Sequence, residues 1–425
     1  MKKFILTGVG IVIFLPFVSC YNRLEEEVAN EESFVSLETE FLLPVTKDSV
    51  LIDIHGNSYH DYIPKLDREQ YLENKLFLMG WSGLNVSEID TTGQFIKNIT
   101  RRGNGPGEIP VGNYASVWQS TDGGIYVLTS GNAFMLYVFD KNANYRYTLR
   151  LFEYLSNVFR PPLTSFHFTE KDEDGKFYLT LAAGSTLHSE FTKSYYKNAD
   201  VLARFEINEY QQKIVSAETI MSYEDFPEMV EVLKEDKVFW FNLYPLFHRI
   251  GNKTYLTFPF SDCIYVLNEN FKIEEKIKSK VLSEVKKVRI GSDFLPKTPS
   301  EYYDRVYYRN KNAFGNLYVT NLQVLDDLVI VQFSKPSDEK DFLHKFPTRE
   351  QAYEDQRNYE GFVHKRDQYW LIYNMKNKKE DLIKLPPEYS TGIFLDKGRM
   401  LVEKKFDDLE GFYLMKYTLP EAIGQ

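Results

Sequence analysis

Cysteine is nearly absent from this chain. The 425 residues include two cysteines, Cys20 and Cys263, so at most one disulfide can form within a chain and a scaffold held by several disulfides is excluded. A basic block is missing too: 51 Lys and Arg are outnumbered by 61 Asp and Glu, which gives a formal net charge of −10. An acidic chain of this kind is a poor partner for nucleic acid or for an anionic membrane surface.

Motifs for catalysis and metal binding are missing as well. No serine occupies a G-x-S-x-G elbow, and the stretch 170–175, which resembles the start of a calcium loop, would place Leu181 where a bidentate Glu is required. No two of the seven histidines are spaced as H-x-x-x-H, and Cys263 has no close metal-ligand companion in the sequence. We therefore predict no cofactor and no metal centre, and we interpret Cys263 as a small buried residue of a strand.

Long hydrophobic runs are limited to the amino terminus. After a cationic start, an apolar run of 15 residues covers 4–18, contains Pro16 and is followed by Ser19-Cys20. A bilayer span needs about 20 residues, so residues 1–19 are interpreted as a secretory signal peptide.

The residues before the predicted cleavage site resemble a lipobox. Phe17-Val18-Ser19-Cys20 departs from the usual Leu-Ala-Gly-Cys pattern at three positions and keeps only the small residue before the cysteine. We expect cleavage before Cys20 and lipidation of its thiol, because several acyl chains on one cysteine anchor a protein stably. The alternative is an ordinary secreted protein in which Cys20 is incidental.

A polar tether, residues 20–33, separates the predicted lipid from a predicted folded domain, residues 34–425. Its acidic cluster, Glu25-Glu26-Glu27, resembles the surface-export signal of Bacteroidetes lipoproteins, although a solvated linker would have the same composition. We expect a lipid-anchored protein of the cell envelope at the outer membrane, and the sequence leaves open whether it faces the periplasm or the surface.

Aromatic residues are abundant, at 16 % of the chain, and they occur in short alternating runs typical of strands. A strand that ends in an acidic or amide turn, followed by a second strand, recurs five times. Repetition of one such unit indicates a repeat architecture. The copies are 85–90 with 95–100, 136–140 with 145–151, 201–208 with 213–218, 263–268 with 272–278, and 369–374 with 381–385.

Further strands with tight Asp-Gly or Gly-Asn turns precede these copies, and four antiparallel strands per unit make a propeller blade. A sixth unit, 393–418, is one strand short, and we expect residues 34–42 to supply that strand. The sequence therefore predicts an all-β, six-bladed β-propeller closed by an N-terminal strand, although its length would allow seven or eight blades. Three insertions, 223–239, 279–312 and 337–361, are expected to form loops or short helices above one face.

The most distinctive motif is Arg-Arg-Gly-Asn-Gly-Pro-Gly-Glu at 101–108. Glu108 occupies the third glycine position of G-x-G-x-x-G, so the motif favours a tight crossover between blades over a nucleotide site. Together with the leader and the repeat, its residues Gly103, Gly105, Pro106, Gly107 and Glu108 resemble the six-bladed β-propeller lipoproteins of Bacteroidetes. Several branches of that group are known only as domains of unknown function, so the resemblance implies fold and anchoring and supplies no activity.

A second motif, Ser-Thr-Asp-Gly-Gly at 120–124, partly resembles the Asp-box of sialidase propellers, and the Arg160 region faintly resembles an arginine motif of those enzymes. The box lacks its closing Thr-Trp, and it is a structural turn even in sialidases. A sialidase also needs an arginine cluster, a tyrosine nucleophile and a carboxylate pair, and the sequence singles out no such set.

Loops that converge at the ends of a propeller are natural ligand sites, where aromatic faces stack on sugars and arginines pair with carboxylates. We predict a non-enzymatic binding or scaffold protein for a glycan, peptide or protein partner. The alternative is an envelope carbohydrate-active enzyme, a hydrolase or lyase, which two buried carboxylates about 5–9 Å apart beside an arginine would favour. The candidate ligand-binding residues are Trp81, Arg101, Arg102, Tyr114, Trp118, Arg160, His248, Arg249 and Tyr302.

Overall fold

The computed structural model divides the chain into two compact units, Met1–Ser36 and Leu37–Gln425, and the described residues all belong to the second. The predicted signal peptide, Cys20 and the tether therefore lie outside them. Within the described part of the chain, no helix is long and apolar enough to cross a membrane. The structure describes residues 40–41, 50–51, 62–63, 75–80, 85–90, 94–110, 113–131, 134–154, 165–183, 193–234, 244–286, 315–336, 339–345, 347–348, 368–384, 389–394, 399–404 and 411–416.

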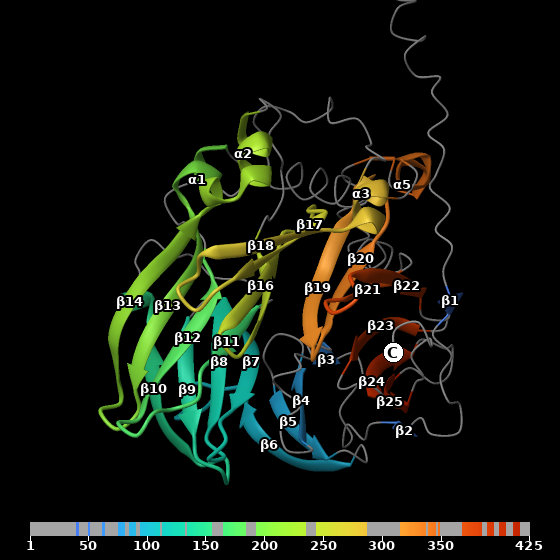
Figure 1. Cartoon of the computed structure of the whole chain (residues 1–425). Coiled ribbons are helices and arrows are strands. Elements are labelled where there is room, and N and C mark those ends of the chain that lie inside the picture. Colours follow the sequence, from blue (N-terminus) through green and yellow to red (C-terminus); the bar gives the residue numbers. More distant parts are fainter. Residues whose placement is uncertain are drawn as a thin grey trace, which may run out of the picture. The chain divides into compact units, whose positions relative to one another are not determined.

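The described residues form an all-β, propeller-like arrangement of six sheets, each built mainly from strands that are consecutive in the sequence (Figure 1). The consecutive strands within each sheet pair antiparallel. All five predicted hairpin copies are confirmed.

The first sheet contains β3 (Tyr62–Ile63), β4 (Lys75–Gly80), β5 (Asn85–Asp90) and β6 (Phe95–Arg101). The second contains β7 (Asn113–Gln119), β8 (Ile125–Gly131), β9 (Met135–Phe139) and β10 (Tyr145–Arg150). The third contains β11 (Phe166–Phe168), β12 (Lys176–Ala182), β13 (Asp200–Asn208) and β14 (Lys213–Ser222). The fourth sheet contains β15 (Leu246–Ile250), β16 (Lys253–Thr257), β17 (Cys263–Leu267) and β18 (Ile273–Lys278). The fifth contains β19 (Tyr318–Leu325), β20 (Leu328–Ser334), β21 (Gln368–Asn374) and β22 (Lys379–Lys384). The sixth contains β23 (Tyr389–Phe394), β24 (Arg399–Lys404) and β25 (Gly411–Lys416).

The sixth sheet takes its outer strand from the amino-terminal part of the chain, but not from the predicted residues. β2 (Val50–Leu51) pairs antiparallel with β25, whereas the predicted segment 34–42 supplies β1 (Glu40–Phe41), which pairs parallel with β22 as a fifth strand of the fifth sheet. The predicted position of the closing strand is therefore wrong. Both short strands cover a sheet edge and its unpaired backbone groups, and both are apolar enough for an edge, so local sequence could not rank them.

The recurring acidic or amide residue has a local role in the hairpin turn. Asp140 Oδ1 accepts hydrogen bonds from the backbone N–H groups of Asn142 and Asn144, both at 2.9 Å. Asn268 Oδ1 accepts in the same way from Asn270 and Lys272, both at 3.0 Å. A short side chain that satisfies the turn's own N–H groups stabilises the reversal of the chain, which explains why the residue type recurs at one position of the unit.

Hydrophobic side chains pack between sheets that follow one another in the chain. Alternate residues of a strand face opposite sides, so the strands contribute to two cores, and β17 and β20 are buried along their whole length. Shared clusters contain Phe77 and Val127 from the first and second sheets, Leu202 and Phe247 from the third and fourth, and Ile264 and Val331 from the fourth and fifth. Ring contacts join Trp118 to Phe177 between the second and third sheets and Trp370 to Phe394 between the fifth and sixth.

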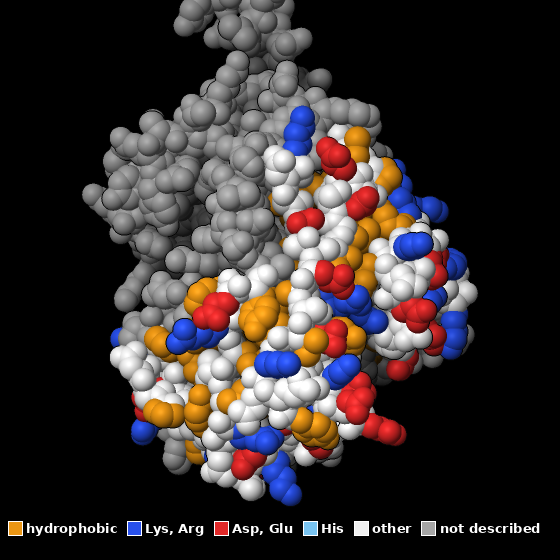
Figure 2. All heavy atoms as spheres, turned by 90° about the vertical axis from the view of Figure 1, so that its left-hand side faces the viewer, with side chains coloured by type: hydrophobic (Ala, Val, Ile, Leu, Met, Phe, Trp, Pro, Cys, Tyr) orange, Lys and Arg blue, Asp and Glu red, His pale blue; other side chains and the backbone are white. Residues whose placement is uncertain are grey.

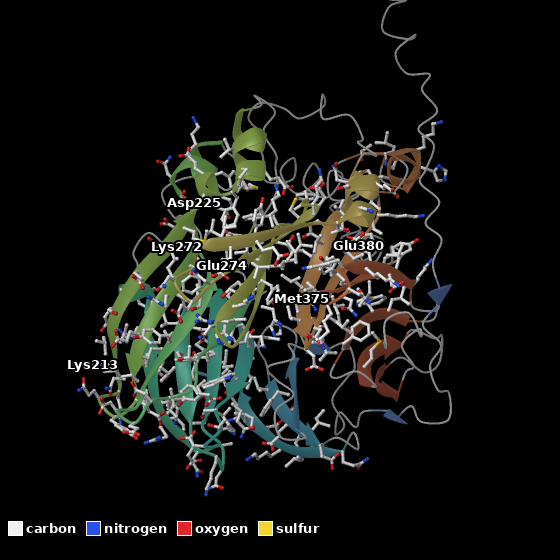
Figure 3. All side chains as sticks on the ribbon, viewed as in Figure 1. Lys213, Asp225, Lys272, Glu274, Met375 and Glu380 are labelled. Atoms are coloured by element: carbon white, nitrogen blue, oxygen red, sulfur yellow. The ribbon has the colours of Figure 1, made fainter. Side chains whose placement is uncertain are left out.

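The described α-helices all belong to connections at the end of the sheets opposite the tight hairpin turns (Figure 1). α1 (Lys193–Asn198) and α5 (Glu339–Lys345) join the second and third strands of a sheet, and α2 (Pro227–Lys234) and α3 (Lys280–Lys286) join one sheet to the next. Figure 3 labels Lys213, at the hairpin end of β14, and Asp225, in the 3-10 helix η5 (Tyr223–Asp225) that follows the other end of the strand. α2 lies within the predicted insertion 223–239, so a short helix in this insertion is confirmed.

The glycine-rich turn after the first sheet is built around the carboxylate of Glu108. Its Oε2 accepts a hydrogen bond from Gly105 N at 2.8 Å, and its Oε1 accepts one from Arg101 Nε at 2.8 Å. The backbone hydrogen bond from Gly105, followed by that from Arg101, holds the pKa of Glu108 below its usual value. A Cβ on Gly103 would lie 1.9 Å from Glu108 Oε2, and one on Gly105 would lie 3.0 Å from it, so these glycines leave room for the carboxylate.

We expect Gly107→Ala to lower the free energy of unfolding by about 2–3 kcal/mol. Gly107 has a φ of +75°, and a Cβ there would lie 2.9 Å from Cβ of Tyr145. Gly251→Ala is the matched control, because its φ is +55° but an added Cβ would meet no heavy atom within 4 Å, and we expect it to cost about 1 kcal/mol. Urea unfolding followed by circular dichroism compares the two variants, and equal losses would show that the contact with Tyr145 has no effect.

Candidate functional site

The predicted ligand-binding residues that the structure describes lie in three separate places. Arg101 and Arg102 are exposed beside the glycine-rich turn, Trp118 lies between the second and third sheets, and His248 and Arg249 belong to β15. Three further candidates, Trp81, Arg160 and Tyr302, fall outside the described residues, and Tyr114 belongs to β7 without a described side chain.

Two of these residues are held inside the protein. Trp118 is 3 % exposed, and its ring stacks on Phe168 with 4.8 Å between centroids. His248 is also buried, and its Nδ1 accepts a hydrogen bond from Val324 N at 2.8 Å. Both side chains therefore connect adjacent sheets in this structure, while Arg249 is half-buried and reaches the surface.

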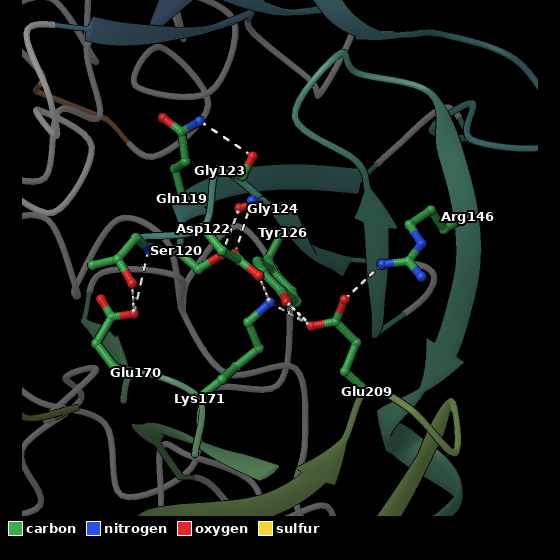
Figure 4. A network of polar contacts seen from close by, with 11 residues as sticks. Gln119, Ser120, Asp122, Gly123, Gly124, Tyr126, Arg146, Glu170, Lys171 and Glu209 are labelled. Carbon is green, nitrogen blue, oxygen red and sulfur yellow. Dashed lines mark hydrogen bonds and ion pairs between the residues drawn. The ribbon is translucent and has the colours of Figure 1, made fainter. Parts of the chain in front are cut away.

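An ion-pair network joins the hairpin turns of the second and third sheets (Figure 4). Lys171 Nζ contacts a carboxylate oxygen of Asp122 and lies 2.8 Å from Glu209 Oε2. Glu209 also accepts hydrogen bonds from Tyr126 Oη at 2.6 Å and from Arg146 Nη1 at 2.7 Å. The two turns that meet here are the Asp-box-like segment and the calcium-loop-like segment of the sequence, and the structure gives both a role in joining sheets.

This ion-pair network combines two carboxylates with an arginine, but only Glu209 is buried: the side chain of Asp122 is 58 % exposed, whereas the enzyme alternative requires two buried carboxylates. Desolvation alone would raise the pKa of Asp122, yet hydrogen bonds from Lys171 and Ser120 outweigh it and lower the pKa to about 2. A carboxyl group that acidic is ionised at neutral pH and cannot serve as a general acid. Tyr126 is fully buried, and desolvation, followed by the hydrogen bond to Glu209, raises its pKa, so it is neither ionised nor reachable by a substrate.

An arginine–aromatic cluster, defined as Tyr178, Arg204, Arg249 and Phe271, lies at the next junction, between the third and fourth sheets. Arg249 Cζ is 5.4 Å from the centroid of the Phe271 ring, and Arg204 Cζ is 5.6 Å from the same ring and 5.2 Å from that of Tyr178. Phe271 is 4 % exposed, whereas Tyr178 is 37 % exposed. Cations at these distances from an aromatic face are attracted by its quadrupole, so the rings hold two guanidinium groups close together.

The two arginines differ in how their charges are balanced. Arg204 forms a hydrogen-bonded ion pair with Glu218, with 2.8 Å between Nε and Oε1. Arg249 donates from Nε to the carbonyl oxygen of Gly251 at 3.4 Å and makes no ion pair with any carboxylate that the structure describes. Burial lowers the pKa of Arg249, the charge of Arg204 lowers it further, and Glu269 acts in the opposite direction. Arg249 is therefore a partly desolvated cation that forms no ion pair with a carboxylate among the described residues, although Glu269 acts on it electrostatically.

Of the four members of the arginine–aromatic cluster, only Arg249 was among the predicted ligand-binding residues. Arg204 and Tyr178 belong to an adjacent sheet, and only the packing of the two sheets brings them to Arg249. The unusual backbone of Phe271 is visible only in the structure: its φ is +58°, a conformation that is rare for a bulky residue. The corresponding turns place Ala143, Gln212 and Lys378 in that conformation.

The described part of the face shown in Figure 2 has no broad field of one sign. In Figure 2, Lys and Arg, Asp and Glu, and hydrophobic side chains are interspersed over the described part of the face in view. Long-range steering of a charged ligand needs a surface dominated by one charge, so recognition on this face depends on local groups.

Comparison with known proteins gives a fold and no activity. No protein-family model matches the chain, and no curated protein matches it significantly. The chain is similar to a solved member of the DUF4221 family from Bacteroides vulgatus, with a TM-score of 0.53 and 12 % identity over 90 % of this chain and 98 % of that chain. At this identity the likeness shows the propeller-like fold alone.

Two other solved structures are less similar. They are a protein from Bacteroides fragilis described as exported (TM-score 0.45, 13 % identity, 90 % of this chain and 95 % of that chain) and a protein of unknown function from Bacteroides caccae (TM-score 0.36, 11 % identity, 73 % and 78 %). Neither likeness is close enough to carry an argument.

Proposed function

We propose that this chain is a lipid-anchored, six-bladed β-propeller of the cell envelope that binds an acidic glycan through the arginine–aromatic cluster. The leader and the lipobox-like residues before Cys20 support export and anchoring at the outer membrane. The six described sheets, with N-terminal strands on the fifth and sixth, support six blades.

The observation that carries the binding role is the half-buried guanidinium of Arg249, which forms no ion pair with any carboxylate in the described part of the chain. A half-buried arginine gains most from a partner that restores the hydrogen bonds and the counter-charge lost on burial, and its planar fork fits a carboxylate or a sulfate. The partly exposed ring of Tyr178 lies in the same cluster and offers a face on which a sugar can stack. A glycan that bears carboxylate or sulfate groups meets both requirements, whereas a neutral glycan meets only the second.

Binding is tested on a glycan array that includes uronate-containing, sulfated and neutral glycans, followed by titration of the best ligand. We expect acidic glycans to bind and Arg249→Met to weaken binding at least tenfold, since a charge-assisted hydrogen bond contributes about 1.5–3 kcal/mol. Arg150→Met is the matched control, because Arg150 is 64 % exposed and pairs with Glu153 away from the cluster. Equal binding of neutral glycans, or unchanged binding by Arg249→Met, would overturn the proposal and favour a protein or peptide partner.

The anchor is tested separately by labelling cells with a fatty-acid analogue. We expect Cys20→Ala to abolish labelling, because the acyl chains are attached to this residue. Cys263→Ala removes the other cysteine and should leave the label in place. Label retained on the Cys20→Ala variant would contradict lipidation at Cys20.

A further inference from the structure

Three side chains able to bind a metal ion meet where α2 approaches the start of β17. Glu228 lies in the first turn of α2, and Asp262 and Cys263 are neighbours at the beginning of β17. Their ligand atoms all lie within 4.8 Å of one another. Cys263 is 1 % and Asp262 8 % exposed, while Glu228 is half-buried, so the group opens to solvent on the side of α2.

The spacing of these atoms fits coordination of one ion. Cys263 Sγ lies 3.6 Å from Asp262 Oδ1. For a tetrahedral Zn²⁺ ion, bond lengths of about 2.3 Å to sulfur and about 2.0 Å to oxygen place two such ligand atoms about 3.5 Å apart. The thiol and the carboxylate, which share a hydrogen bond here, are therefore already separated by the distance that a shared ion imposes, and the Glu228 carboxylate lies within 4.8 Å of both.

Each of the two carboxylates accepts a hydrogen bond from a serine hydroxyl group. Ser261 Oγ donates to Glu228 Oε2 at 2.6 Å, and Ser283 Oγ, from α3, donates to Asp262 Oδ2 at 2.7 Å. The second bond leaves Asp262 Oδ1 directed at the thiol. Hydrogen bonds of this kind orient ligands in metal sites and tune their affinity. Lys278 Nζ lies 3.9 Å from Asp262 Oδ2 on a side chain that is 68 % exposed, so it is free to move away when a cation enters.

A separate observation also points to a missing ligand. Tyr265 is 1 % exposed and its hydroxyl has no hydrogen-bond partner of normal geometry, although a buried hydroxyl normally finds one. Tyr265 lies two residues after Cys263 on the same face of β17. The buried hydroxyl therefore belongs to the same face of the strand as the thiol of Cys263.

We propose that Glu228, Asp262 and Cys263 bind one Zn²⁺ ion and leave its fourth position open to water or to an exogenous ligand. A thiolate together with two carboxylates selects a borderline-soft ion over Ca²⁺ or Mg²⁺, which prefer oxygen ligands alone. Binding releases the thiol proton of Cys263, and water in the fourth position is a natural acceptor for the hydroxyl of Tyr265. The site is independent of the arginine–aromatic cluster and of glycan binding.

The test uses the full chain with Cys20→Ala, which makes Cys263 the only thiol, and Co²⁺ as a spectroscopic probe. We expect one Co²⁺ per chain, an absorption band from thiolate-to-cobalt charge transfer, and loss of the band when Zn²⁺ is added. Cys263→Ser should abolish the band, and Glu228→Gln should weaken Zn²⁺ binding at least tenfold. Glu284→Gln, an exposed residue next to Ser283, is the matched control and should bind like the parent.

Thermal unfolding gives a second measurement, which does not depend on the Co²⁺ absorption spectrum. Zn²⁺ should raise the unfolding temperature of the parent and of Glu284→Gln, but not that of Cys263→Ser, because a ligand that binds only the folded state stabilises it. Circular dichroism establishes that each variant is folded, and Glu228→Gln provides the test if the change at Cys263 prevents folding. A parent chain without the charge-transfer band, or an equal shift in Cys263→Ser, would overturn the proposal.

Discussion

Replacing Trp118 with alanine is expected to lower the free energy of unfolding by about 4 kcal/mol. The indole is 3 % exposed and contacts aromatic rings of two sheets: Phe168 lies 4.8 Å away at an interplanar angle of 13°, and Tyr126 lies 5.0 Å away. Truncation removes this contact and leaves a cavity between two sheets whose strands are fixed by their own hydrogen bonds. Because the sheets cannot collapse into the space, the loss should lie in the upper part of the range for large core residues.

Two comparisons separate packing from other effects of this change. Trp118→Phe keeps a ring in the junction and should cost about 1–2 kcal/mol, and Tyr210→Ala, at a residue that is 73 % exposed, should change stability by less than about 0.5 kcal/mol. All variants are compared by urea unfolding at neutral pH. A loss below about 1 kcal/mol for Trp118→Ala would contradict a packing role, and Trp118 would again be a candidate for ligand binding.

The strands could be predicted because their signals are local. Alternation marks each strand, and the turn residue at its end, such as Asp140 or Asn268, acts on N–H groups within four positions of itself. The pairing of β1 and β2 had no such signal, since each is two residues long and its partner lies more than 300 positions later in the chain. What stabilises an edge strand is a distant neighbour, and the local sequence does not contain it.

The candidate site was predicted only in part for a related reason. In a sheet packed on both faces, alternation does not distinguish a residue that faces a ligand from one that faces the next sheet, so Trp118, His248 and Arg249 looked alike. Asp122 and Lys171 are 49 positions apart, and each belongs to a turn whose local sequence does not reveal its distant partner. Cys263 was judged to have no metal-binding companion, although Asp262 precedes it directly, because no spacing rule covers a third ligand supplied by Glu228 from another element.

Lys171→Met is expected to lower the free energy of unfolding by about 3 kcal/mol. The side chain of Lys171 is 14 % exposed and that of Glu209 is 6 % exposed, so the change leaves a buried carboxylate with one cation fewer. Glu209 keeps its hydrogen bonds from Tyr126 and Arg146, which places the expected loss at the lower end of the range for a broken buried ion pair. The loss is measured by urea unfolding at neutral pH.

Lys176→Met is the matched control for this substitution. Lys176 lies in the same hairpin, its side chain is 43 % exposed, and its nearest carboxylate oxygen, on Glu206, is 3.8 Å away, so its loss should cost less than about 1 kcal/mol. A double-mutant cycle with Glu209→Gln isolates the Lys171–Glu209 interaction. Additive losses would show that the two residues do not interact energetically and would contradict the network as drawn in Figure 4.

The pH dependence of the stability lost in the Lys171→Met variant identifies the contribution of Asp122. Its pKa is lowered to about 2 in the folded chain, against about 3.9 in an unfolded one. A depressed carboxyl pKa stabilises the fold above the unfolded value, and this stabilisation disappears as the pH falls from about 4 to about 2. Because the side chain of Asp122 is 58 % exposed, solvent screening limits its share to less than about 1 kcal/mol.

The difference in unfolding free energy between the parent and Lys171→Met should therefore narrow as the pH falls from about 4 to about 2. Over this range Asp122 is protonated in the unfolded chain, whereas the folded parent keeps its ion pair with Lys171 until the pH approaches about 2. At higher pH the same difference in unfolding free energy should stay constant up to about pH 10. Desolvation lowers the pKa of Lys171, but hydrogen bonds to Asp122 and Glu209 outweigh it and raise the pKa, so Lys171 remains charged over that whole range. A difference that did not narrow in acid would show that Lys171 acts through Glu209 alone and that the contact with Asp122 adds nothing to stability.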